Sequence, residues 1–283
     1  MHLRSLFFTL ALIGAAPASP LDEAVALYRA KRYPEARAAL EKITVEDPKN
    51  AAAVYHLGMT YRRRGDDTAI DDAARWLAKA IELEPNNPTY LADFGGTSMQ
   101  LASKTRSYTA ATKGRDAMIR ALVIDPENLD ARDGLLQFYT RAPWPLGSAS
   151  KALAQAEEIR KRDPQRGLVS LIGLKLTEKN YAAAALLCEE VLKKSPDDYL
   201  ALYQIGRIAS LGGENIERGL NTLKRCLDLA PPPNSPSHSH AHYRIGTLLE
   251  KKGDAPAARA AYTAALQLDS SNQSATDALT KLK

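Results

Sequence analysis

Three histidines alternate with small residues near the C-terminal end of the chain, at His238, His240 and His242. If a helix begins after Ser235 with Pro236 as its first residue, His238 and His242 lie one turn apart on the same face. Imidazoles at that spacing can hold zinc or nickel, but no third ligand is evident in the sequence. The simpler interpretation is a polar helix start, and a weak metal site is the alternative; no cofactor is predicted.

Acidic side chains gather at Asp66, Asp67, Asp71 and Asp72, but their spacing is not that of a calcium-binding EF-hand loop. We expect them to cap the following helix and to interact favourably with its dipole. The sequence contains no phosphate-binding loop, no H-E-x-x-H and no G-x-S-x-G. Because the repeats described next account for nearly every stretch, little sequence remains for a catalytic domain, and we expect no enzyme.

The elements that would position these residues belong to a repeated unit. A pattern of four residues recurs along the chain. It consists of an apolar residue, a second apolar residue three positions later, a glycine directly after that one, and a further residue three positions after the glycine. The copies are Val54/Leu57/Gly58/Tyr61, Leu91/Phe94/Gly95/Ser98, Leu202/Ile205/Gly206/Ala209 and, with a histidine first, His242/Ile245/Gly246/Leu249. Prolines close the repeats 32 to 41 residues apart, at Pro48, Pro85, Pro126, Pro164, Pro196 and Pro231, with Ser270 in the last place. A period of this size is typical of a solenoid.

The second helix of each repeat carries a small residue, another residue four positions later and a third one three positions further. The sets are Ala36/Leu40/Ile43, Ala73/Leu77/Ala80, Gly114/Met118/Ala121, Ala152/Ala156/Ile159, Ala184/Cys188/Val191, Gly219/Leu223/Cys226 and Ala258/Tyr262/Ala265. These spacings place each set on one helical face. The small residues let the two helices of a repeat approach to about 8–10 Å.

These positions resemble the tetratricopeptide repeat, whose consensus has W-x2-L-G-x2-Y in helix A, A-x3-F-x2-A in helix B and then a proline. Repeats two, six and seven match well, whereas repeats one, four and five match only in helix B and the proline. Ala24, Leu136 and Ile172 stand where glycine is usual, and the consensus tryptophan is never present. The resemblance covers roughly residues 19–270 and implies an all-α fold, a right-handed superhelical solenoid of about seven helix-turn-helix repeats.

We predict a signal peptide over residues 1–18 and the solenoid over residues 19–283. The expected repeats cover residues 20–48, 51–85, 88–126, 129–164, 165–198, 199–231 and 236–270. Residues 273–283 are expected to form a capping helix over the apolar end of the stack, because terminal repeats need a polar outer face.

The N-terminal segment has the pattern of a secretory signal peptide. Arg4 precedes an apolar run, and Ala16 and Ala18 supply the small residues of a cleavage site. The run of about eleven residues is too short to span a bilayer, which takes about 20. Pro17 and Pro20 argue against the alternative, a buried first helix. We expect cleavage after Ala18, a periplasmic or secreted protein, and no stable membrane insertion afterwards.

The only two cysteines, Cys188 and Cys226, lie on the second helices of neighbouring repeats. Export would permit a disulfide bond, but such helices are about 8–10 Å or more apart, whereas a disulfide needs Cα atoms within about 7 Å. We expect two buried free thiols. Trp144, between two prolines, is either an interface anchor or, as we prefer, a residue folded back onto the solenoid.

In proteins that resemble this one, helix A lines the concave face, which implies a binding site there. The candidate ligand-binding residues are Tyr55, His56, Met59, Arg62, Arg63, Tyr203, Gln204, Arg207, Tyr243 and Arg244. Asp93, Asp130 and Asp133 are on the same face in repeats three and four. Tyrosine with arginine suits an extended peptide, because rings supply contact area and guanidinium groups bind carboxylates and carbonyls. A merely solvated face is the alternative.

The leading hypothesis is therefore an exported, non-enzymatic scaffold that binds a peptide segment or subunit of a protein partner in the groove. The alternative is a small-molecule or metal-binding accessory protein of an envelope transport system, which would need a closed, deep pocket. The net charge of +5 is spread along the chain. Since no basic stripe with interleaved aromatic residues is present, no nucleic-acid partner is expected.

Overall fold

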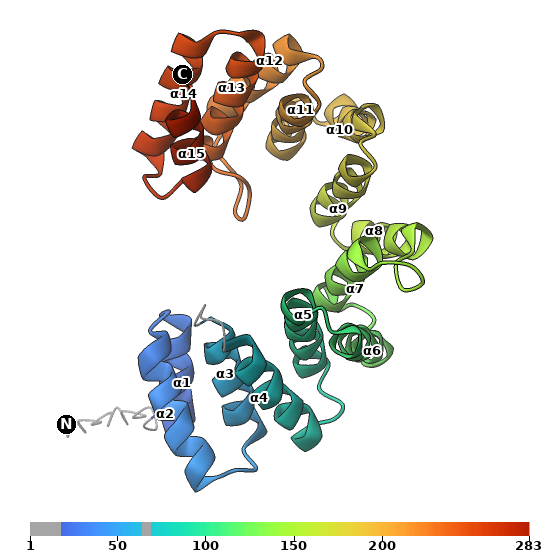
Figure 1. The fold of residues 1–283 in the computed structure, drawn as a ribbon, viewed down its shortest axis with the longest axis vertical. Coiled ribbons are helices and arrows are strands. Elements are labelled where there is room, and N and C mark those ends of the chain that lie inside the picture. Colours follow the sequence, from blue (N-terminus) through green and yellow to red (C-terminus); the bar gives the residue numbers. More distant parts are fainter. Residues whose placement is uncertain (1–17, 64–68, 283) are drawn as a thin grey trace, which may run out of the picture. The chain divides into compact units, whose positions relative to one another are not determined.

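The computed structural model describes residues 18–63 and 69–282. Residues 1–17 of the expected signal peptide, together with Asp66 and Asp67, lie outside the described residues. Within the described ranges the chain forms fifteen α-helices and no strand, which confirms the predicted all-α fold (Figure 1). The chain divides into an N-terminal unit that ends at Gly134 and a C-terminal unit that begins at Leu135, inside helix α7 (Leu129–Arg141).

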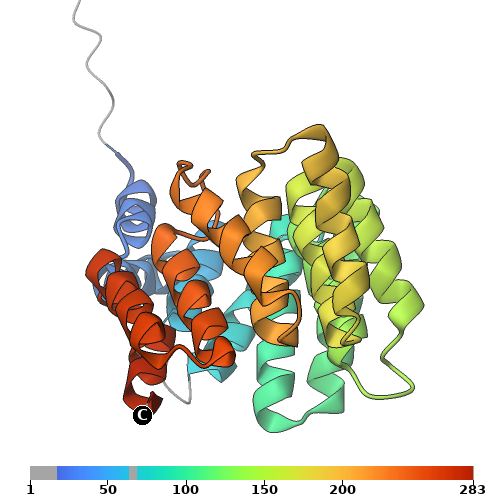
Figure 2. The same cartoon turned by 90° about the horizontal axis from the view of Figure 1, so that it is seen from above.

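The N-terminal unit is built from consecutive helical hairpins. Its helices are α1 (Pro20–Arg29), α2 (Tyr33–Glu46), α3 (Ala51–Arg62), α4 (Ala69–Leu83), α5 (Pro88–Thr105) and α6 (Tyr108–Ile124), followed by the first half of α7. Helices α1 and α2, α3 and α4, and α5 and α6 pack against each other as pairs, and each pair also contacts the next (Figures 1 and 2). This arrangement is the predicted solenoid of helical hairpins.

Side-chain caps set where several of these helices begin. Ser19 accepts a hydrogen bond from the Asp22 amide at 3.1 Å, and the Asp22 carboxylate accepts one from the Ser19 amide at 3.2 Å. The Asn50 side chain accepts from the Ala53 amide at 3.0 Å at the start of α3. Each such bond satisfies a backbone donor that the helix itself leaves unpaired.

Close approach within a hairpin depends on the repeated glycines. A Cβ atom on Gly58 in α3 would lie 3.0 Å from Cγ of Leu77 in α4, closer than ordinary van der Waals contact. The space that the missing side chain leaves is thus filled by the partner helix. Leu40 and Leu57 are fully buried between α1, α2 and α3, together with Ala24 and Ala53. The core of this unit therefore runs along the seam between successive hairpins.

The C-terminal unit continues the pattern after the second half of α7. Its helices are α8 (Ala149–Arg162), α9 (Pro164–Thr177), α10 (Tyr181–Lys194), α11 (Tyr199–Gly212), α12 (Ile216–Leu227), α13 (His238–Lys252), α14 (Ala255–Leu268) and α15 (Gln273–Lys281). Leu202, Leu223 and Leu248 are buried together between α11, α12 and α13. The short α15 packs on α14 and α13, as expected of the capping helix.

Two helix boundaries differ from those predicted from the sequence. Pro164 begins α9 instead of closing the preceding repeat, because Asp163 alone ends α8 and caps α9, accepting a hydrogen bond from the Arg166 amide at 2.9 Å. Proline is tolerated there because the first turn of a helix needs no amide donor. Helix α13 begins at His238, two residues later than expected, and the Pro236 carbonyl accepts a hydrogen bond from the Tyr199 hydroxyl at 2.6 Å.

Candidate functional site

Two tyrosines and an aspartate join the first helices of neighbouring hairpins in the N-terminal unit. Tyr55 of α3 stacks on Tyr90 of α5 with ring centroids 4.3 Å apart and planes inclined by 17°. The Tyr55 hydroxyl donates a hydrogen bond of 2.7 Å to Oδ2 of Asp93. Burial, reinforced by the Asp93 charge, raises the pKa of Tyr55 well above its ordinary value. This hydroxyl therefore stays protonated and remains a donor.

Arg62 completes this network from the last turn of α3. Its Nη1 lies 2.9 Å from Oδ1 of Asp93, and the two side chains are only 23% and 27% exposed. A Cβ atom on Gly96 would be 3.5 Å from Nη2 of Arg62, an ordinary van der Waals contact, so the guanidinium lies close to the backbone of α5. Arg62 and Asp93, both expected on the binding face, thus neutralise each other. Their main effect is to hold α3 and α5 in one arrangement.

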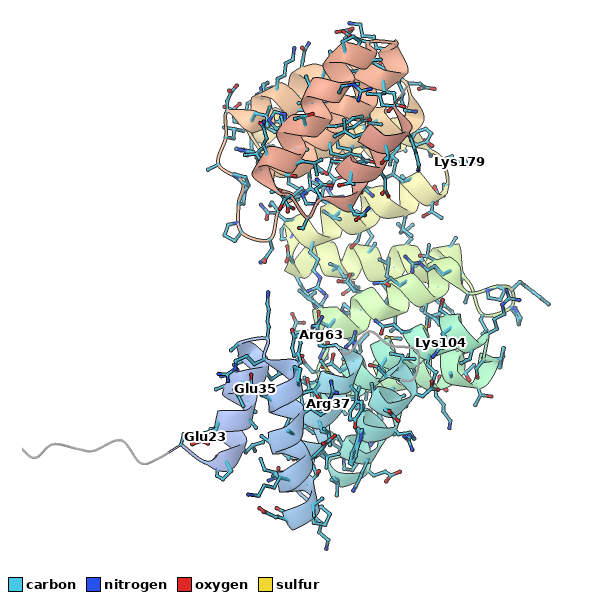
Figure 3. All side chains as sticks on the ribbon, turned by 60° about the vertical axis from the view of Figure 1, so that its left-hand side comes forward. Glu23, Glu35, Arg37, Arg63, Lys104 and Lys179 are labelled. Carbon is cyan, nitrogen blue, oxygen red and sulfur yellow. The ribbon has the colours of Figure 1, made fainter. Side chains whose placement is uncertain are left out.

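His56 and Arg63 lie beside a tyrosine that the sequence analysis did not select. The His56 ring is 5.8 Å from that of Tyr28 and 4.9 Å from that of Tyr55. Burial, with the nearby charge of Arg29, lowers the pKa of His56, so the ring is neutral at neutral pH. A hydrogen bond with Tyr28 raises the pKa of Arg63, which is exposed at the end of α3 (Figure 3).

Tyr28 extends this face and could have been anticipated from the sequence, whereas Tyr90 is buried against Tyr55. Tyr28 stands four residues after Ala24, just as Arg62 stands four residues after Gly58, so the repeat register marks it as a helix A position. The weak match of the first repeat concealed it. Met59, like Tyr90, is buried among packing residues, which leaves little of its side chain for a ligand.

The C-terminal unit positions its candidates on α11 and α13. Tyr203 and Gln204 are only 4% and 3% exposed, so they are packing residues in this structure. Gln204 accepts a hydrogen bond of 3.2 Å from Nη1 of Arg207. The Arg244 guanidinium lies over the Tyr243 ring, 5.0 Å from its centroid. Arg207, Tyr243 and Arg244 are all half-buried and remain partly accessible.

Several of the other residues singled out in the sequence have structural partners. Nε2 of His238 lies 2.8 Å from the Leu229 carbonyl, and Nδ1 of His240 lies 3.0 Å from the Ser237 hydroxyl. In the described part of the chain, no three His, Cys, Asp or Glu side chains gather as a metal-ligand set. Asp71 and Asp72 lie in the first turn of α4, as expected.

The two cysteines are free and buried, which confirms the expectation. Each thiol lies 3.6 Å from a backbone carbonyl oxygen, that of Ala184 for Cys188 and that of Tyr199 for Cys226. Burial raises the pKa of each thiol to about 12. Both are therefore protonated and unreactive at neutral pH.

Trp144 contradicts the preferred interpretation, because its side chain is 91% exposed and does not fold back onto the helices. The loop closes on itself through its own backbone. The amides of Leu146 and Gly147 both donate to the Pro143 carbonyl, at 2.9 Å and 3.0 Å. These backbone hydrogen bonds hold the turn without the Trp144 side chain, and the indole faces solvent.

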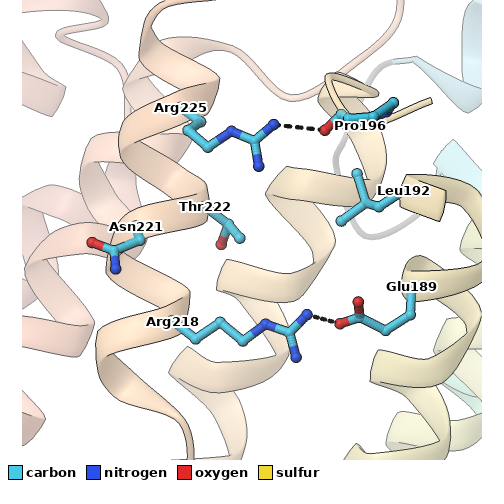
Figure 4. Close-up of a pocket in the computed structure, with 7 residues that line it drawn as sticks. All are labelled: Glu189, Leu192, Pro196, Arg218, Asn221, Thr222 and Arg225. Atoms are coloured by element: carbon cyan, nitrogen blue, oxygen red, sulfur yellow. Dashed lines mark hydrogen bonds and ion pairs between the residues drawn. The ribbon is translucent and has the colours of Figure 1, made fainter.

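A surface cleft of about 500 Å³ lies between the second helices α10 and α12 (Figure 4). Its lining residues are Glu189, Leu192, Pro196, Arg218, Asn221, Thr222 and Arg225. Arg218 is paired with Glu189, and Arg225 donates to the Pro196 carbonyl at 2.7 Å. Since both cations already have protein partners, the cleft presents no unmet charge to a ligand.

None of the helices within the described residues combines the length and the apolar character that crossing a bilayer requires.

Comparison with solved structures finds the same fold. A tetratricopeptide repeat protein from Parabacteroides merdae is 14% identical, with a TM-score of 0.65, over 92% of this chain and 96% of that one. Yeast Tom70 is 15% identical, with a TM-score of 0.72, over 97% of this chain and 58% of that one. The human IFIT1 dimer with m7Gppp-AAAA is 18% identical, with a TM-score of 0.57, over 93% and 62%. No curated relative matches in a sequence search.

The family comparison agrees with this fold. The family described as Tetratricopeptide repeat matches residues 21–88 in the N-terminal unit and residues 208–273 in the C-terminal unit. Such repeats are typically non-catalytic scaffolds for interactions with proteins or peptides. Together with the helical hairpins and the glycine-mediated packing, the matches show that both units contain tetratricopeptide repeats.

Proposed function

We propose that the protein is a non-enzymatic scaffold that binds an extended peptide segment of a protein partner on the faces of its first helices. The observation that carries this proposal is the network of Tyr55, Tyr90, Asp93 and Arg62, which holds α3 and α5 beside each other. A face positioned in this way loses little conformational freedom when a peptide binds. The rings of Tyr55 and His56 supply contact area next to the charged side chains.

Export is part of the same proposal and is supported by the sequence alone. The basic residue, the short apolar run and the small residues up to Ala18 favour cleavage and release into the periplasm or the medium. Intact-mass measurement of the protein from a secreting host would test it. The expected mass corresponds to a chain that begins at Ser19, and a retained Met1 would contradict it.

Site-specific photo-crosslinking tests the binding face. A photoreactive amino acid at His56 is expected to capture a protein partner in the native compartment. The control is the same amino acid at Leu186, an exposed residue of the second helix α10. Both positions lie in helices, but only the first is on the proposed face. Capture at Leu186 and not at His56 would overturn the proposal, as would equal capture of the same partner at both.

A further inference from the structure

One connection between successive hairpins is much longer than the others in the described part of the chain. The connection from α12 to α13 spans ten residues, 228–237, and we term it the proline loop (Figure 1). Asp163 alone joins α8 to α9, and each remaining connection of this kind takes four residues. The four-residue connections are 47–50, 84–87, 125–128, 195–198 and 269–272. Joining two hairpins therefore does not require the additional residues, and such surface insertions are common places for function.

Three consecutive prolines give this loop an extended backbone. The rings of Pro231, Pro232 and Pro233 hold φ at about −65°. A residue that precedes a proline is kept out of the helical region, which applies to Ala230 and to the first two prolines. The chain from Ala230 to Pro233 thus takes the polyproline II form, and it ends at Asn234, whose φ is 61°. Pro231 and Pro233 are exposed, and Pro232 is half-buried.

Side chains of the neighbouring helices hold both ends of the proline loop. Nε2 of His238 on α13 lies 2.8 Å from the Leu229 carbonyl oxygen, and Leu229 itself packs against the core formed by α11, α12 and α13. At the other end, the Tyr199 hydroxyl of α11 donates to the Pro236 carbonyl at 2.6 Å. A segment that is restrained at both ends loses little conformational freedom when it binds.

The segment from Ala230 to Pro233 offers apolar rings and hydrogen-bond acceptors. Proline has no amide hydrogen, so its backbone can only accept. The Ser235 amide donates to the Pro232 carbonyl at 3.1 Å, whereas no group of the described residues donates to the other three carbonyls of the segment. No side chain of residues 229–236 is charged. A partner must therefore supply apolar area together with donors, and tyrosine and tryptophan side chains supply both.

We propose that the proline loop is the ligand of a second protein, whose groove of aromatic side chains binds the rings of Pro231 and Pro233 and donates hydrogen bonds to their carbonyl oxygens. A preformed polyproline II segment suits such a groove, because its ordering costs little and its carbonyls are free to accept. In this interaction the loop is the segment that is recognised, whereas in the proposed function the first helices recognise a peptide. The two interactions use different residues and can occur independently.

Photo-crosslinking in the native compartment tests the loop. A photoreactive amino acid replaces Ala230, which is exposed, and leaves the three prolines intact. The control position is Ser270, an exposed residue of the four-residue connection between α14 and α15. A protein other than this chain is expected to be captured at Ala230 and not at Ser270. Mass spectrometry should place the crosslink beside a tryptophan or tyrosine of the captured protein, and P231A/P232A/P233A should abolish capture.

Three outcomes of the crosslinking would overturn the proposal. They are no capture at Ala230, equal capture of the same protein at Ser270, and capture that persists in P231A/P232A/P233A. Capture of a second copy of this chain would also overturn it, in favour of self-association in which the 91% exposed Trp144 supplies the aromatic ring. These outcomes do not depend on the result of crosslinking at His56, which tests the first helices.

Affinity measurements with the purified captured protein test the chemistry of recognition. P231A/P232A/P233A is expected to weaken binding roughly 10-fold or more, and P231A alone to weaken it less. Y199F keeps all the prolines but removes the hydrogen bond at one end of the loop, and should weaken binding only about 2- to 10-fold. The control P85A changes an exposed proline of a four-residue connection and should bind as the wild type does.

Two further readouts separate recognition of the prolines from other causes. The helical circular dichroism signal should be the same in all four variants, since the prolines lie outside the helices. Affinity should be nearly independent of salt concentration, because the recognised segment carries no charge. A steep fall of affinity with salt, or an equal loss of binding in P85A and P231A/P232A/P233A, would overturn the assignment to the proline loop.

Discussion

Replacing a glycine by alanine on a first helix should stabilise the protein at one position of the C-terminal unit and fail to do so at another. A Cβ atom on Gly206 of α11 would lie 2.6 Å from each of two methyl carbons of Leu223 and closer still to its Cγ. Leu223 is fully buried and cannot turn away into solvent. A Cβ atom on Gly173 of α9 would have no heavy atom within 4 Å. A comparison of the two substitutions therefore separates the effect of close helix packing from the effect of helix propensity.

The magnitudes follow from these surroundings. Gly173→Ala should raise the free energy of unfolding by about 1 kcal/mol, the propensity difference between alanine and glycine in a helix interior. Gly206→Ala gains the same amount but must displace Leu223, and such overpacking costs about 1–3 kcal/mol. The expected net effect ranges from nearly zero to a loss of about 2 kcal/mol. The difference between the two variants should therefore be about 1–3 kcal/mol.

Urea denaturation followed by circular dichroism measures the free energy of unfolding of both variants and of the wild type. The slope of the unfolding free energy against urea concentration should stay the same, since neither change alters the surface exposed on unfolding. If Gly206→Ala stabilises the protein as much as Gly173→Ala, then α11 does not depend on a glycine to approach α12. The explanation of the repeated glycines as close-packing positions would then be wrong.

Three further predictions concern other parts of the structure. Asp93→Asn should lower the free energy of unfolding by about 1–2 kcal/mol, because it removes a charged partner from the half-buried Arg62, as urea denaturation would show. Cys188 and Cys226 should resist a thiol reagent in the native protein at pH 7 and react, both of them, in denaturant, since burial raises each pKa to about 12. Trp144→Phe should remove the tryptophan fluorescence most easily quenched by acrylamide, with a change in unfolding free energy within about 0.5 kcal/mol.

Each of these predictions has a control or an outcome that would contradict it. Asp197→Asn removes the partner of Arg225 from an exposed ion pair and should change stability by no more than about 1 kcal/mol. An equal effect of both aspartate variants would mean that burial of the Arg62 pair contributes nothing. Absence of thiol reactivity in denaturant would indicate a disulfide bond. Quenching that is unchanged by Trp144→Phe would show that Trp76 is the accessible indole.

The sequence by itself determined the class of fold. Small residues and larger apolar ones recur at spacings of three and four, and these spacings define one face of a helix wherever they occur. The repeat of that face, with its closing prolines, required each hairpin to pack on the next. The buried free state of the two cysteines followed from the same register, because helix spacing alone keeps two such side chains apart.

The tertiary structure decided which side chains of the predicted face remain available. Tyr203 and Gln204 fall in the right register but are buried, whereas Trp144 was expected against the helices and is exposed. The partners of the charged side chains were also undetermined, since Arg62 pairs with Asp93 from 31 residues away, while Arg207 is hydrogen-bonded to the neutral Gln204. Periodicity reports the direction in which a side chain leaves its own helix. Burial and pairing depend on what the neighbouring helices place opposite it, and that is set only when the hairpins pack together.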